Sequence, residues 1–337
     1  MSLIGNTQEQ KGPHVRMKKC FSRRDFLNRA TAWSIAATGA VALTCGRVSG
    51  EGARRFKLCL VPGSIGVKVA PPELITLAHR HGFEAIEANA GFLASLGKAD
   101  LAAFLGEMKA KGLVFGAAGL PVDFRRDDSK FRAGLDELPK QADALQRAGV
   151  ERVGTWISPA HDELSYEQNF RQHADRLRQI ALVLKEHGLR LGLEYVGTPS
   201  LRKGRRYEFI HSMTQMRALI AEIGTGNVGY VLDTWHWWTA GETEADLLSL
   251  KPTDVISVDL NDAPLGIPLE QQQDNQRELP CATGVIPTAI FMRALQKLGY
   301  DGPVRAEPFN KKLNAMSADE ACAATIAALR KAVALLT

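Results

Sequence analysis

The sequence lacks several patterns that mark common kinds of binding site. Its five cysteines include no C-x-x-C pair, so a zinc site built on cysteine is not expected, and a single disulfide stays open as an alternative. No G-x-G-x-x-G follows the first apolar run, where the chain reads P-G-S-I-G, so a dinucleotide-binding loop is not indicated. The Ala-rich run 30–43 is shorter than the ~20 residues of a membrane-spanning helix. We therefore expect no stable membrane span after processing.

Net charge is small outside the N-terminal segment. The chain has a formal charge of +5, but residues 1–50 hold eight Lys and Arg against two acidic residues, which gives +6. The remaining residues therefore carry a net charge of −1. A nearly neutral body has no general attraction for nucleic acid or for an acidic membrane surface, so we expect no nucleic-acid partner. The hydrophobic content of 45% indicates a globular protein.

The basic N-terminal segment contains a motif of its own. Its run Met17–Leu27 reads M-K-K-C-F-S-R-R-D-F-L and resembles a twin-arginine export signal, with Arg23 and Arg24 as the pair. A mildly apolar run follows, as in a leader peptide. The resemblance implies a leader over residues 1–50, recognition by the twin-arginine export machinery, and a periplasmic location in a bacterium. The alternative is an ordinary amphipathic N-terminal helix.

From residue 55 onward the sequence repeats one kind of unit. A helical segment ends in glycine, a common helix C-cap, and a short apolar strand then runs into a polar residue. Such alternation over residues 55–337 favours a closed parallel (β/α)8 barrel, or TIM barrel, and an open doubly wound sheet is the alternative. The predicted strands lie at 56–61, 83–87, 113–119, 150–156, 189–194, 228–233, 255–259 and 303–307.

Three of the connections that follow strands are long. They cover residues 119–132, 195–211 and 261–287, whereas the connections that precede strands are short. In a barrel of this type, the connections that follow strands all lie at the C-terminal ends of the strands, where active sites form. We therefore expect the functional site at that face.

Four of the predicted strands end in a carboxylate. Their last residues are Glu194, Asp233, Asp259 and Glu307, in the runs L-G-L-E, Y-V-L-D, I-S-V-D and V-R-A-E. Carboxylates that converge on one barrel axis repel one another unless a cation lies between them. An all-oxygen set favours Mg²⁺ or Mn²⁺ over Zn²⁺. The alternative, for each residue alone, is that it caps the next helix or pairs with a surface arginine.

Further residues near the same face are candidates for binding a substrate. His236 follows Asp233 by three residues in the run V-L-D-T-W-H-W-W, among three tryptophans. Sugars stack on aromatic faces, and a histidine side chain can bond to a substrate oxygen, although both residue types also occur as ordinary core. The candidates are His236, Glu87, Trp156, Trp237 and Arg305.

Four stretches, L-E, L-D-T-x-H, V-D-L-N-D and E-P-F, together resemble the xylose-isomerase-like TIM-barrel superfamily. That group includes sugar phosphate isomerases and epimerases and proteins of the AP-endonuclease type. The resemblance implies one divalent metal, Mn²⁺, Mg²⁺ or Co²⁺, held by a Glu, Asp, His, Glu set from strands five to eight. Glu194, Asp233 and Glu307 match this set. Asp259 stands where many members have His, so the implied set here is all carboxylate.

The resemblance also implies a reaction, the transfer of a proton next to a carbonyl in a sugar or keto-sugar. In the epimerases of the group, the first and last glutamates of the metal set act as acid and base on opposite faces, which implies Glu194 and Glu307 here. His236 matches a histidine that contacts the substrate. The stretch R-E-L-P that begins at Arg277 resembles a further pattern of the family.

Other functions remain open beside an isomerase or epimerase. The same site would serve a lyase or dehydratase acting on 3-keto-sugars or glycosides, and a non-catalytic periplasmic sugar-binding barrel is a further alternative. A nuclease fits least, because AP-endonuclease-type members need three metals and many histidines, and the chain beyond the leader has seven. Barrels of this family often form dimers or tetramers, which makes a homo-oligomer compatible with the resemblance.

Overall fold

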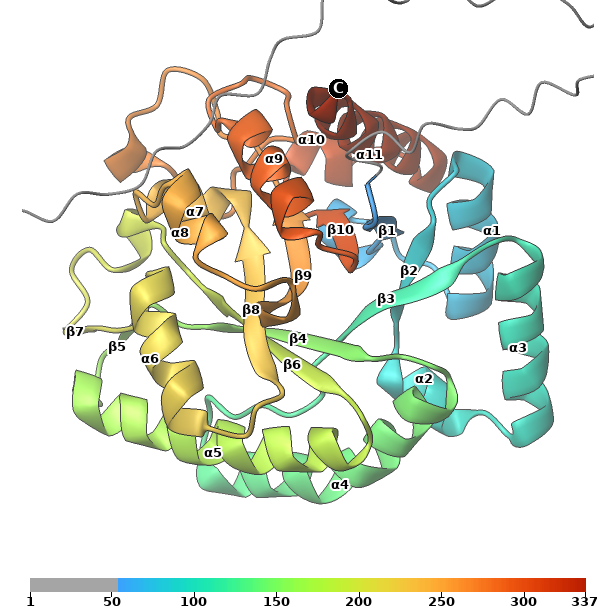
Figure 1. Cartoon of the computed structure of the whole chain (residues 1–337), viewed down its shortest axis with the longest axis horizontal. Coiled ribbons are helices and arrows are strands. Elements are labelled where there is room, and N and C mark those ends of the chain that lie inside the picture. The colour runs from blue at the N-terminus through green and yellow to red at the C-terminus, as the bar shows by residue number, and fades with distance from the viewer. Residues whose placement is uncertain (1–53) are drawn as a thin grey trace, which may run out of the picture. The chain divides into compact units, whose positions relative to one another are not determined.

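The computed structural model describes residues 54–337, which form a closed barrel of eight parallel strands surrounded by helices (Figure 1). Around the barrel the strands follow the order β1, β10, β9, β8, β6, β4, β3, β2, which confirms the predicted (β/α)8 fold. The predicted leader and its twin-arginine motif lie outside the described residues. The barrel strands are β1 (Lys57–Leu60), β2 (Ala85–Ala88), β3 (Val114–Gly119), β4 (Arg152–Ile157), β6 (Arg190–Tyr195), β8 (Val228–Asp233), β9 (Val255–Leu260) and β10 (Pro303–Ala306).

The main helices end where the glycine pattern predicts. For example, Gly82 and Gly224 have φ angles of 75° and 67°, the left-handed conformation that terminates a helix at little cost for glycine. The helices are α1 (Pro71–His81), α2 (Ala90–Ser95), α3 (Lys98–Ala110), α4 (Asp128–Arg147), α5 (Tyr166–Glu186), α6 (Met213–Ile223), α7 (Thr234–Thr239), α8 (Glu244–Leu248), α9 (Thr288–Leu298), α10 (Lys311–Asn314) and α11 (Ala318–Val333).

Two of the long connections contain structure that the sequence pattern did not predict. Helix α4 begins at Asp128, inside the stretch expected to be a loop, because the side chain of Asp127 accepts a hydrogen bond from the backbone N–H of Lys130 and caps the helix. The connections after β4 and β6 are joined by an antiparallel pair of two-residue strands, β5 (Ala160–His161) and β7 (Tyr207–Glu208). These contacts fix the loops that rise beside the C-terminal ends of the strands.

Small residues inside the barrel make room for Val231. Side chains alternate along a strand, so Val231 faces the same interior as Asp233 two residues later. A Cβ atom on Gly192 would lie 2.8 Å from Cγ2 of Val231, closer than van der Waals contact allows, and one on Gly154 would lie 3.3 Å from it. Glycine at these two positions of β6 and β4 therefore lets Val231 fill the middle of the barrel, below the predicted carboxylates.

The three cysteines of the described region, Cys59, Cys281 and Cys322, are free thiols. Cys59 and Cys322 are buried and pack as small hydrophobic residues. Within residues 54–337, none of the helices has the length and apolar character needed to cross a membrane.

Candidate metal centre and substrate cavity

The four predicted carboxylates meet at the C-terminal end of the barrel. One oxygen each from Glu194, Asp233, Asp259 and Glu307 lies within 4.8 Å of the others. The first three lie on β6, β8 and β9, and Glu307 follows β10 directly. The register places Asp233 beside Asp259 and Arg305 beside Asp259 on the neighbouring strand. We call these four residues the carboxylate cluster.

Asp233 is completely buried and has a structural role as well as a place in the cluster. Its Oδ1 atom accepts a hydrogen bond from the backbone N–H of Trp235 at 2.6 Å and so caps α7. The amide of Asn261 donates to both of its oxygens, at 2.9 and 3.0 Å. Asp233 therefore does cap the next helix, as the alternative for each carboxylate predicted. The capping bonds also orient its carboxylate within the cluster, so the two roles are compatible.

Arg277 is buried among the acidic groups, with a side chain only 1% exposed. Its guanidinium contacts Asp233 at 2.9 Å, Asp274 at 2.9 Å and Glu307 at 3.4 Å. Burial opposes its charge, but the attraction of Asp233 and the other carboxylates outweighs burial and raises the pKa of Arg277. This arginine therefore neutralises one side of the cluster permanently.

Arg305 is a second arginine that neutralises the cluster. It donates to both oxygens of Asp259, through Nε to Oδ1 and through Nη2 to Oδ2 at 2.8 Å, and it lies 3.4 Å from Glu307. Asp259 is 0% exposed, and its ion pair with Arg305 offsets the free-energy cost of burying its charge. Asp259 stands where many members of the similar family have histidine, and Arg305 on the adjacent strand balances the charge that this aspartate adds.

Glu194 differs from the other three carboxylates, because one of its oxygens has no hydrogen-bond donor. Oε1 of Glu194 is buried and has no partner, which is rare for a charged group in a folded protein. Burial, followed by repulsion from Glu307, raises the pKa of Glu194 well above its usual range. Burial is also the largest cause that raises the pKa of Asp233 to about 6 and that of Glu307 to about 7. Such a set holds either extra protons or a cation.

His236 lies on α7 and is 2% exposed. Its Nδ1 accepts a hydrogen bond from the backbone N–H of Gly197 at 3.2 Å, and its Nε2 lies 3.2 Å from a guanidinium nitrogen of Arg277. Burial and the charge of Arg277 lower the pKa of His236 to about 3, so the ring is neutral. His236 also forms a possible three-residue metal group with Glu194 and Asp233.

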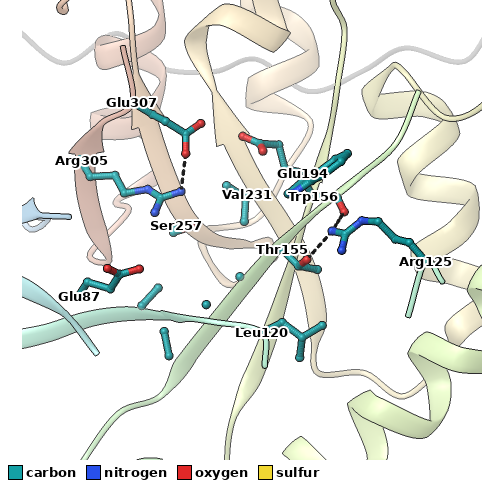
Figure 2. Close-up of a pocket in the computed structure, with 14 residues that line it drawn as sticks. Glu87, Leu120, Arg125, Thr155, Trp156, Glu194, Val231, Ser257, Arg305 and Glu307 are labelled. Carbon is teal, nitrogen blue, oxygen red and sulfur yellow. Dashed lines mark hydrogen bonds and ion pairs between the residues drawn. The ribbon is translucent and has the colours of Figure 1, made fainter. Parts of the chain in front are cut away.

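A cavity of about 290 Å³ opens beside the cluster (Figure 2). This volume is at the lower end of the range of roughly 300–1,000 Å³ for small-molecule sites, which suits a ligand the size of a monosaccharide. Figure 2 shows Arg305 and Glu307 on one wall and Arg125 on the opposite one. The lining of the cavity includes five of the residues proposed from the sequence: Glu87, Trp156, Glu194, Arg305 and Glu307.

Trp237 lies elsewhere. Its ring packs against Phe291, with centroids 5.6 Å apart, and its Nε1 atom donates to the backbone oxygen of Thr243 at 3.1 Å. It is 3% exposed and is not part of the cavity lining. The structure therefore places Trp237 in the core, because the apolar face of α7 turns towards α9 rather than towards the barrel axis.

Sequence reasoning missed Arg125 and Asn261. Asn261 follows β9 by one residue in V-D-L-N-D, and its position beside a predicted ligand is the signal that could have identified it. Arg125 lies in the charged connection after β3, where Arg126 and Arg132 are equal candidates by sequence. Only the structure shows which of these arginines turns into the cavity.

Comparisons with known proteins agree with this architecture. The family described as Xylose isomerase-like TIM barrel matches residues 75–332. An inosose isomerase of Bacillus velezensis is 23% identical over 257 residues, which cover 73% of this chain and 86% of that protein. Among solved structures, a xylose isomerase domain protein from Alicyclobacillus acidocaldarius has a TM-score of 0.74 and 32% identity, covering 83% of this chain and 99% of its own.

A second solved structure adds a metal to the comparison. The IOLI protein, crystallised with a bound zinc atom, superposes with a TM-score of 0.69 at 20% identity, covering 84% of this chain and 99% of its own. At that identity the likeness concerns the fold alone. The match of the family to residues 75–332 spans most of the chain, and the chain therefore belongs to the xylose isomerase-like TIM barrel family.

Proposed function

We propose that this protein is a divalent-metal-dependent isomerase or epimerase of a sugar or keto-sugar, which transfers a proton next to a carbonyl. The observation that carries the proposal is the buried, unpartnered Oε1 of Glu194 within the carboxylate cluster, beside a cavity of monosaccharide size. The likeness to an inosose isomerase supports an isomerase rather than a hydrolase.

The residues present fit a divalent metal. Glu194, Asp233, Asp259 and Glu307 each offer one oxygen. Both oxygens of Asp233 and of Asp259 also accept hydrogen bonds, which fix the direction of these two carboxylates. We propose Mn²⁺ or Mg²⁺, because carboxylate oxygens are the ligands these ions prefer, with Co²⁺ as a substitute. When bound, the ion would polarise the substrate carbonyl and make the adjacent C–H bond more acidic.

The side chains around the cluster would divide the remaining work. Glu194 on β6 and Glu307 after β10 approach the cavity from different sides, so one accepts the proton and the other returns it to the opposite face (Figure 2). The pKa of Glu307, about 7, suits an acid–base group at neutral pH. His236, the substrate-contacting candidate from the sequence, is neutral, accepts a bond from Gly197 at Nδ1 and lies 3.2 Å from Arg277 at Nε2, so its role is to hold Arg277 in place beside the cluster.

Solvent-deuterium exchange into sugars tests this proposal. The metal-loaded protein is incubated in D₂O with a panel of ketoses and keto-glycosides, and exchange of the α-proton is followed by NMR. Exchange that disappears in Asp233→Asn supports the proposal. Absence of exchange across the panel, with sugar binding intact, favours a sugar-binding barrel. Product analysis then separates an epimer from the dehydrated product of a lyase.

The N-terminal motif supports an exported, periplasmic enzyme. Replacing Arg23 and Arg24 together by lysine should block twin-arginine export, and cell fractionation of the full chain measures the result. Unchanged export of this variant would contradict the export signal without affecting the proposed chemistry.

A further inference from the structure

Three arginines face the carboxylate cluster or its cavity, and they differ in the groups that neutralise them. Arg277 has three carboxylate partners, and Arg305 pairs with Asp259 and Glu307. Arg125 lines the cavity, but among residues 54–337 no carboxylate forms an ion pair with it. Asp123 and Glu194 act on its charge only from a distance, so its guanidinium faces the cavity without a direct ionic partner.

The structure holds Arg125 firmly without neutralising it. Its Nη2 atom donates to the hydroxyl of Thr155 at 2.7 Å and to the backbone oxygen of Trp156 (Figure 2). Its guanidinium carbon lies 4.3 Å from the ring centroids of both Phe124 and Trp156, so the group is stacked between two aromatic rings. Because these contacts already order the Arg125 side chain, little of its conformational entropy would be lost when a ligand binds.

Two nitrogen atoms of Arg125 have no hydrogen-bond partner among the described residues. Nε is buried without a hydrogen-bond partner, and Nη1 has no partner among the described residues. Burial lowers the pKa of Arg125 to about 10, so the side chain still carries its charge at neutral pH. Nε is closed to solvent, so Nη1 is the nitrogen that a ligand oxygen in the cavity can reach.

We propose that Arg125 binds a carboxylate of the substrate, so that the site prefers sugar acids, such as keto-uronic acids, to neutral sugars. A carboxylate carries one negative charge, as the single guanidinium requires. A phosphate carries about two at neutral pH, and the acidic groups of Glu87, Glu194 and Glu307 in the same cavity repel it. The small cavity also restricts the ligand to about one sugar unit.

This inference rests on the proposed function for the reaction, but its binding step can be measured without turnover. D-Gluconate and D-glucitol differ by one carboxylate and contain no ketone, and their binding to the Mn²⁺-loaded protein is measured by calorimetry. We expect gluconate to bind more tightly, and Arg125→Gln to weaken gluconate by about tenfold or more, because a charge-assisted hydrogen bond is lost. Glucitol binding should change by less than about twofold, within the error of such comparisons.

Arg126→Gln is the matched control, since it makes the same charge change one residue away. Arg126 pairs with Asp123, and its side chain is 65% exposed. The control should leave gluconate binding unchanged, and Arg125→Lys should restore part of it, because lysine keeps the charge but loses the planar stacking. Equal losses for gluconate and glucitol in Arg125→Gln would show a purely structural role and overturn the inference. Tighter binding of inorganic phosphate than of acetate at Arg125 would also overturn it, in favour of a phosphorylated ligand.

Deuterium exchange separates this inference from the proposed function. D-Fructuronate and D-fructose form a pair that differs by the carboxylate, and the inference predicts a higher kcat/KM for exchange into fructuronate, lost in Arg125→Gln through KM. If neither sugar exchanges while gluconate binding still depends on Arg125, the proposed function fails and the inference stands. If fructose exchanges and Arg125→Gln leaves fructuronate unaffected, the inference fails and the proposed function stands.

Discussion

The barrel has a cavity at each end, and the two are similar in size. The site cavity beside the carboxylate cluster has about 290 Å³, and a second cavity at the N-terminal ends of the strands has about 240 Å³. Charged residues line both. In the second cavity, however, Arg152 pairs with Asp301 at 3.0 Å and lies 3.5 Å from Glu151.

The difference between the two ends lies in how charge is balanced. At the N-terminal end the arginine and the acidic residues neutralise one another at the surface, where Asp301 and Glu151 are 60% and 71% exposed. At the C-terminal end the acidic groups are buried and outnumber their partners, and the carboxyl groups of Asp233, Glu194 and Glu307 have raised pKa values. Cavity size therefore does not distinguish the two ends, whereas unbalanced buried charge does, and it supports the proposed site at the C-terminal end.

The largest expected effect concerns Asp233. Asp233→Asn keeps the size of the side chain but removes one charge of the proposed metal site. If the proposal holds, exchange activity should fall on the order of a thousandfold, since a catalytic metal supplies several kcal/mol of transition-state stabilisation. Steady-state exchange rates measure the loss. Asp301→Asn makes the same change at the other end and should leave activity within about twofold, as for surface positions. Similar losses in both variants would contradict the distinction between the two cavities.

The next effect concerns the buried pair of Arg305 and Asp259. Arg305→Met leaves the carboxylate of Asp259 buried without its partner, which should lower the free energy of unfolding by about 3 kcal/mol. Urea denaturation of the metal-free protein measures this. A loss below ~1 kcal/mol would contradict this prediction, because it would mean that the pair contributes no more than an exposed ion pair.

A third prediction concerns pH. The folded-state pKa values of Asp233 and Glu307, about 6 and 7, exceed the ordinary values of 3.8 and 4.5. The folded metal-free protein therefore binds more protons than the unfolded chain between pH 4 and 7, so this contribution to stability is complete at low pH and is lost as pH rises through about 7.

Metal binding should show the opposite trend. Ligands must lose their protons, so metal affinity should rise with pH over the same window, by about tenfold per pH unit for each proton displaced. Thermal denaturation with and without Mn²⁺ from pH 5 to 8 measures both trends. Stabilisation by Mn²⁺ that does not change with pH would show that the ion binds somewhere other than at these carboxylates.

The smallest effect is expected at the N-terminal end. Arg152→Gln removes the exposed pair with Asp301, and we expect a change in unfolding free energy below about 1 kcal/mol, as for most surface ion pairs. Comparison with Arg305→Met in the same urea series sharpens the contrast between the two ends. A larger cost for Arg152→Gln would point instead to the buried Nε of Arg152 as a structural group.

The barrel could be predicted because strand, helix and C-cap glycine recur in a fixed order along the chain. This pattern is local, and glycines such as Gly82 and Gly224 mark each helix end in the sequence itself. The sequence also predicted which strands end in carboxylates, because a charge at the end of an apolar run is visible without the structure. The convergence of Glu194 and Asp233 follows from the closure of the barrel.

The pairing of charges could not be predicted in the same way. The bond between Arg305 and Asp259 depends on the register of β9 and β10, and the bond between Arg277 and Asp233 joins residues that are 44 positions apart. The direction of Arg125 depends on the packing of Phe124 and Trp156. Trp237 was a predicted site residue whose ring turned to the core, since the six-residue helix α7 presents its tryptophans on more than one face.

The most direct test of the account is the metal content of the purified protein and of its Glu194→Gln variant. Glutamine keeps the shape of the side chain, but its amide cannot replace a carboxylate oxygen as an anionic ligand. After equilibration with Mn²⁺ and removal of excess, elemental analysis should find about one ion per wild-type chain and far less in the variant. Equal metal contents in the two proteins, or none in the wild type, would contradict the proposal that the carboxylate cluster is a metal site.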